Sequence, residues 1–143
     1  MSESQFAFLV GEFRDEFDSA SWAERHALSD PGPAIIYARK ALESAVKWVY
    51  ENDRQMPQVY EKKLNAYLND PAFKEIANGK VYELAKRIQR AGNSAVHESK
   101  PPTPLEAVEV VSALFHFSLW FAYTYGRSTK PDLSLRFDPN KLP

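Results

Sequence analysis

The sequence contains no cysteine. This absence excludes disulfide bonds, thiolate catalysis and cysteine-ligated metal sites, and it suits the reducing cytoplasm, where we expect the protein to act. An excess of basic charge is also missing, because 18 lysines and arginines stand against 19 aspartates and glutamates. Any contact with a nucleic acid must therefore come from a local cluster of cations and not from the charge of the whole molecule.

Short motifs of several large enzyme classes are absent as well. The chain has neither a GxxxxGK[ST] phosphate loop nor a GxGxxG dinucleotide loop, so this segment is not itself an ATPase or a Rossmann-type enzyme. His97 and Glu98 are not followed by the second histidine of a zinc-binding HExxH helix, and His26 and His116 lie far away in sequence. We therefore expect no metal site and no cofactor.

Membrane and export signals are weak. The first ten residues, MSESQFAFLV, lack the basic flank and the long apolar core of a signal peptide. Residues 105–125 are long and apolar enough to span a bilayer. This stretch contains Glu106, Glu109 and His116, however, which favours a buried helix of a globular domain and no membrane contact.

Helical periodicity dominates the rest and predicts an all-α bundle of four to five helices over residues 1–126. The spans expected to be helical are 5–14, 20–28, 34–53, 60–68, 81–97 and 104–126. Breaks are expected at SDPGP (29–33), DRQMPQ (53–58), NDP (69–71), NG (78–79) and SKPPTP (99–104). Residues 127–143 are punctuated by proline and have no clear period, which predicts a linker or an extended strap of a domain within a longer chain.

Several helix ends have recognisable signals. Asp30 is a candidate N-cap, and Thr103 with Pro104 and Glu106 forms a capping box with a first-turn proline. Gly126 is a candidate C-cap of the last helix. That helix is apolar nearly all round, so it is either the central helix of the bundle, which we favour, or a helix that a partner also covers.

Residues 81–97 separate into two stripes on a helical wheel. The apolar stripe consists of Val81, Leu84, Ala85, Ile88, Gly92, Ala95 and Val96, and the polar stripe opposite it consists of Lys86, Arg90, Asn93 and His97. A glycine in the apolar stripe costs about 0.8–1 kcal/mol relative to alanine, which is explained if another helix approaches closely there. Periodicity leaves two interpretations of the polar stripe open: a solvated face, or a functional face that a second subunit covers.

The sequence Arg90-AGNSAV-His97 resembles the R-x(4–6)-H motif of the HEPN superfamily. Four ordered segments carry a narrower resemblance: QFAFL (5–9), SDPGPAIIYARKALESAVKWVYE (29–51), IQRAGNSAVHES (88–99) and LWFAYTYG (119–126). Together they resemble the helical domain of unknown function found at the N-terminus of some type I restriction enzyme R subunits and in other bacterial proteins. The resemblance covers roughly residues 5–126.

This resemblance implies a HEPN-like bundle that pairs about a two-fold axis or joins a partner subunit of a restriction complex, with RNA or DNA as a ligand. Active HEPN members are metal-independent endoribonucleases with arginine and histidine from both subunits in one cleft. The implied catalytic residues here are Arg90, Asn93 and His97, and Lys86 and Arg90 would bind nucleic acid. Arg39 and Glu43 also match family positions, and we interpret them as structural residues of a helix face.

The residue types fit that chemistry. RNA supplies its own nucleophile, the 2′-hydroxyl group, so a metal-activated water is not needed. Histidine exchanges a proton near neutral pH, and arginine offers a planar charged fork to phosphate oxygens. Three functions remain open: an accessory module of a restriction or anti-phage defence protein, which we favour, a dimeric endoribonuclease, and a pure interaction domain.

Overall fold

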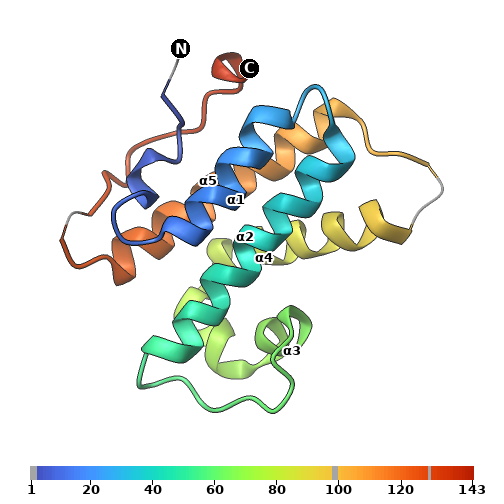
Figure 1. The fold of residues 1–143 in the computed structure, drawn as a ribbon. Helices are drawn as coiled ribbons and strands as arrows, with labels where there is room; N and C mark the ends of the chain where they lie inside the picture. Colours follow the sequence, from blue (N-terminus) through green and yellow to red (C-terminus); the bar gives the residue numbers. More distant parts are fainter. Residues whose placement is uncertain (1–2, 98–99, 129) are drawn as a thin grey trace.

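The computed structural model describes residues 3–97, 100–128 and 130–143, except for the side chain of His97. The described residues form helices and contain no strand, so the predicted all-α bundle is confirmed (Figure 1). The α-helices are α1 (Arg14–His26), α2 (Pro31–Asn52), α3 (Leu64–Asn69), α4 (Pro71–His97) and α5 (Pro104–Tyr125). Two 3-10 turns, η1 (Ala7–Leu9) and η2 (Pro139–Lys141), lie near the ends of the chain.

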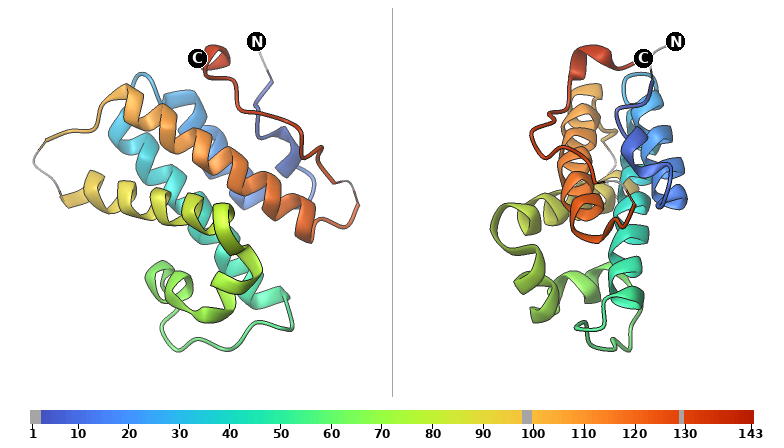
Figure 2. Two further views of the ribbon diagram at one scale, coloured as in Figure 1. Left: turned by 180° about the vertical axis from the view of Figure 1, so that it is seen from behind. Right: turned by 90° about the vertical axis from the view of Figure 1, so that its left-hand side faces the viewer.

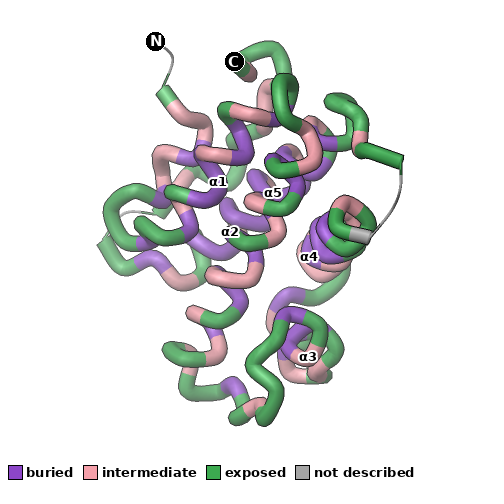
Figure 3. Tube along the Cα trace, turned by 45° about the vertical axis from the view of Figure 1, so that its right-hand side comes forward, coloured by how far each residue is buried: buried purple, intermediate pink, exposed green. Residues whose placement is uncertain are grey.

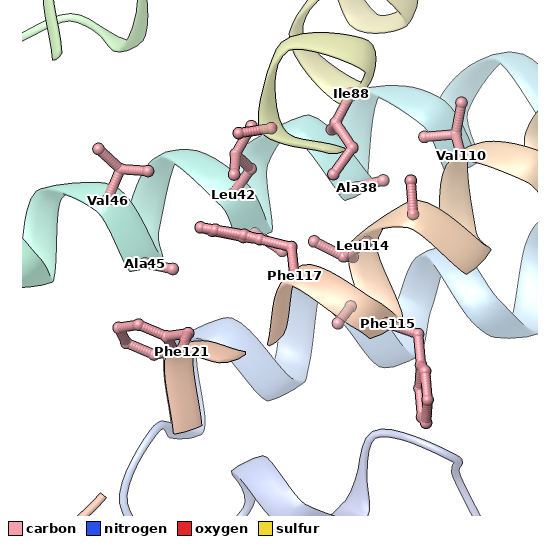
Figure 4. Close-up of a cluster of buried hydrophobic side chains, with 14 of the residues drawn as sticks. Ala38, Leu42, Ala45, Val46, Ile88, Val110, Leu114, Phe115, Phe117 and Phe121 are labelled. Carbon is pink, nitrogen blue, oxygen red and sulfur yellow. The ribbon is translucent and has the colours of Figure 1, made fainter. Parts of the chain in front are cut away.

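The core lies where α2, α4 and α5 meet (Figure 4). Leu42 of α2 packs close to Leu114 and Phe117 of α5, and Ile88 enters from α4. Each of these four side chains is at most 1% exposed. Burial of such side chains contributes about 1.5–3 kcal/mol each, so this contact of three helices stabilises the bundle.

Helix α5 is a core helix of the bundle, as expected of a helix that is apolar nearly all round. Its buried residues are Ala107, Val110, Val111, Ala113, Leu114, Phe115, Phe117, Ser118, Leu119, Phe121 and Ala122. They contact α1, α2, α4 and η1. Among the described helices, α5 alone is long and apolar enough to cross a membrane, and 61% of its most apolar window is buried inside the domain, which is typical of a core helix.

The tail lies across α5 and meets the start of the chain (Figure 2). Phe137 packs against Phe115, with ring centroids 5.9 Å apart. The Gln5 side chain donates to the carbonyl oxygen of Asp138 at 2.9 Å and accepts from the Asp138 amide at 2.8 Å. The first and last described segments therefore lie side by side, and the tail acts as a strap on the bundle.

The prediction of separate helices at 5–14 and 20–28 is wrong. Residues 7–9 form only a 3-10 turn, and α1 runs without a break from Arg14 to His26. Gly11 follows the turn, and glycine is costly inside a helix. Asp15 and Glu16 occupy the first turn of α1, where acidic side chains stabilise a helix N-terminus.

The predicted caps are partly confirmed. The Thr103 hydroxyl accepts from the Glu106 amide at 3.2 Å, and Pro104 begins α5. Asp30 precedes α2 but makes no side-chain cap bond, so that prediction is wrong in its mechanism. Gly126 ends α5 with extended backbone (φ −67°, ψ 141°), so the left-handed cap typical of glycine is not used there.

The boundaries of two further predicted helices also change. The span 34–53 starts earlier, at Pro31, because proline fits the first turn of a helix. The span 60–68 shortens to Leu64–Asn69, and the preceding residues 60–63 form no helix.

Candidate nucleic-acid interface

A break at Asn78 and Gly79 divides α4, as the sequence predicted. Their φ angles are 34° and 31°, positive values that glycine adopts more readily than other residues. The chain changes direction there, and residues 80–97 then run across α2 and beside α5 (Figure 1). This second half of α4 carries the polar stripe.

Polar contacts fix this half of α4 to two neighbouring helices. Arg87 Nη2 lies 2.7 Å from Glu109 Oε2 of α5, in a salt bridge whose side chains are about half exposed. Gln89 is only 3% exposed, and its amide donates to Asn65 Oδ1 of α3 at 3.2 Å. The helical wheel did not predict the burial of Gln89, because a wheel contains no information about α3.

The contact with α2 is made at Gly92. A Cβ atom placed on Gly92 would lie 2.3 Å from Arg39 Cδ and 2.9 Å from Arg39 Cβ. The predicted close approach is therefore confirmed, and the stem of an arginine is what fills the space. Arg39 Nε is buried and has no hydrogen-bond partner among the described residues.

The rest of the apolar stripe follows the prediction except at its end. Ala85, Ile88 and Gly92 are buried, whereas Val96 is 57% exposed. Placing Val96 in the core was wrong, because α4 diverges from α2 beyond Gly92 (Figure 1). The wheel gives the direction of a side chain but not the distance to the next helix.

The polar stripe faces away from the core over the part that the structure describes. Arg90 and Asn93 are exposed, and Lys86 is partly buried. In Figure 3, α4 is seen almost along its axis, with its buried residues toward the rest of the bundle. His97 is the last residue of α4, seven positions after Arg90 and so on the same face, but its side chain lies outside the described residues.

A cationic surface on α2 was missed by the sequence analysis. It surrounds a cavity of about 380 Å³ lined by Ile36, Arg39, Lys40, Glu43, Ser44 and Lys47. Three cations and one carboxylate make this lining positive. We interpreted Arg39 and Glu43 as structural residues of a helix face, yet these two side chains form no salt bridge with each other in the described structure. The seven-residue spacing of Lys40 and Lys47 is the signal that could have identified the surface.

Comparison with known proteins identifies the family to which the chain belongs. A model described as "Domain of unknown function (DUF4145)" matches residues 21–136. The chain belongs to the DUF4145 family. No curated protein and no solved structure matches it. The matched part of this DUF4145 domain contains both the polar stripe of α4 and the cationic surface of α2.

Proposed function

We propose that this DUF4145 domain is an accessory HEPN-like module of a restriction or anti-phage defence protein, such as a type I restriction enzyme R subunit. In this role it senses nucleic acid, while ATP-driven translocation and DNA cleavage belong to other domains. The observation that carries the proposal is the exposure of Arg90 and Asn93 on a helix segment that α2, α3 and α5 hold in place.

The distribution of charge supports a nucleic-acid ligand. The chain has a formal charge of −1, so binding of a phosphate backbone requires a local excess of cations. Lys86 and Arg90 supply such charge on α4, and Lys40 and Lys47 supply it on α2, the helix that crosses α4. An arginine can also bind two phosphate oxygens at once, so we expect it to contribute more to the affinity than a lysine.

Binding can be tested by fluorescence anisotropy with short labelled single-stranded RNA, single-stranded DNA and duplex DNA. We expect affinity that falls as salt rises, and about tenfold weaker binding for Arg90→Ala at low salt, because a charge-assisted contact to phosphate is lost. Arg14→Ala is the matched control, since Arg14 is an exposed arginine of α1 paired with Asp18. Equal losses in the two variants, or no salt-dependent binding, would contradict the proposal.

An endoribonuclease is the second candidate, and the common face of Arg90 and His97 on one unbroken helical segment favours it. Separate acid and base roles need two histidines, so this activity requires a two-fold dimer. The exposed apolar side chains Val96 (57%) and Leu105 (67%), on the last turn of α4 and the first turn of α5, offer surface for such a contact.

Cleavage of single-stranded RNA in EDTA distinguishes the two candidates. An active enzyme would lose on the order of 10²–10⁴-fold in rate on His97→Ala and a comparable factor on Arg90→Ala. RNA that is bound but stays intact supports the sensing module. A purely monomeric state in sedimentation at high concentration would remove the composite active site, and absence of both binding and cleavage would leave an interaction domain with a solvated polar face.

A further inference from the structure

A second cavity, of about 340 Å³, lies between the second half of α4, the outer side of α5 and the tail. Its size falls within the range of small-molecule sites, which are mostly apolar with a few convergent polar groups. Leu84, Leu119 and Trp120 contribute apolar and aromatic surface. The ionisable side chains with basic nitrogens are Lys80, His116 and Arg136, and no described residue of the lining is acidic.

The tail wall of this cavity is held in position before any ligand arrives. Arg136 Nη1 donates to the carbonyl oxygens of Leu133 at 3.1 Å and Leu135 at 2.8 Å. A guanidinium group has five N–H donors, so these two bonds leave donors for a ligand. The contact between Phe137 and Phe115 keeps the next residue of the tail on α5. Such a preformed wall lowers the entropic cost of binding.

The pKa of His116 depends on the charge inside the cavity. Burial lowers its pKa, and the positive charges of Arg136 and Lys80 lower it further. The imidazole is therefore neutral at pH 7, and the two neighbouring cations have no counter-charge in the lining. A bound anion would supply that counter-charge and would raise the pKa of His116.

We propose that this cavity binds a small organic anion with a flat apolar body. The flat aromatic ring of this ligand lies against Trp120 and Tyr123, and Lys80 and Arg136 bind its anionic group. Tyr123 is 44% exposed at the rim, so the ring can enter from solvent. All lining residues fall within the part of the chain that matches the family, and none belongs to the polar stripe. The site is thus independent of nucleic-acid binding by α4.

The test is an NMR titration of the 143-residue chain with 1-naphthoate, its neutral analogue 1-naphthalenemethanol, AMP and inorganic phosphate. The three tryptophans give three indole N–H signals, and Trp120→Phe identifies the one that belongs to the cavity. We expect 1-naphthoate or AMP to shift the signals of Trp120 and His116 saturably. The neutral analogue should bind about tenfold more weakly, because it makes no charge-assisted bond.

Variants at the cations complete the test. Lys80→Gln and Arg136→Gln should each weaken binding on the order of tenfold, with Lys62→Gln and Arg127→Gln as controls at exposed positions outside the cavity. Lys80→Gln is decisive, because Arg136 also bonds to the tail. Stronger binding of AMP would assign a nucleotide, and stronger binding of naphthoate a carboxylate. Absence of saturable shifts, equal binding of the neutral analogue, or unchanged affinity in Lys80→Gln would overturn the proposal.

Discussion

Helix α5 and the second half of α4 pack against each other but bury different shares of their surfaces. Half of α5 is buried, since 11 of its 22 residues lie in the interior. In residues 80–97, the fully buried positions of the described side chains are Ala85, Ile88, Gln89 and Gly92, which follow one side of the helix. The opposite side faces solvent and carries the polar stripe.

The two helices therefore have different roles. Helix α5 stabilises the bundle, and the second half of α4 exposes polar side chains to solvent. Helix α5 contacts α1, α2, α4 and η1 through its buried half, and the outer side that remains lines the cavity at His116. A helix that packs along one side can change its outer residues without disturbing the fold. We therefore expect substitutions at the buried positions of α5 to change stability, and substitutions on the outer side of α4 to change binding.

The largest expected loss of stability is at Phe117, which is 1% exposed in the centre of the bundle. Phe117→Ala should lower the free energy of unfolding by about 3–5 kcal/mol, because it removes buried apolar surface and leaves a cavity. Leu105→Ala, on the same helix but 67% exposed, should stay within about 0.5 kcal/mol. Urea denaturation measures both, and similar losses would show that burial does not decide how much a residue of α5 stabilises the fold.

An intermediate loss of stability is expected where α4 contacts α2. Gly92→Leu should destabilise the domain by about 1–3 kcal/mol, because its side chain would overlap the stem of Arg39. Gly11→Leu is the control, since a Cβ atom there meets nothing within 4 Å. Combining Gly92→Leu with Arg39→Ala should recover part of the loss in a double-mutant cycle. Strictly additive losses would show that Arg39 is not the residue that Gly92 accommodates.

Much of this fold could be predicted from local signals. Proline at the start of α5, the Thr103 cap and the break at Asn78 and Gly79 each act within a few residues, so the sequence alone reveals them. Periodicity also gave the outward direction of Arg90.

The errors in α4 concern the distance between segments. Val96 continues an apolar stripe but projects beyond the crossing with α2, and Gln89 interrupts the expected pattern but is covered by α3. The cavity at His116 was missed for the same reason, since it joins Lys80 of α4 with Arg136 of the tail, 56 positions apart in the numbering. Contacts of that sequence separation depend on the packing of whole helices.

The smallest expected change in stability is at Arg90. Arg90→Ala should leave the free energy of unfolding within about 0.5 kcal/mol, because the side chain is exposed on the outer side of α4. Arg87→Ala, three residues earlier, should cost about 0.2–1 kcal/mol through loss of its salt bridge to Glu109. Nucleic-acid affinity, measured on the same samples, should fall more for Arg90→Ala than for Arg87→Ala. A loss of stability at Arg90 as large as that at Gly92 would show that this side of α4 supports the fold, and the contrast with α5 would then disappear.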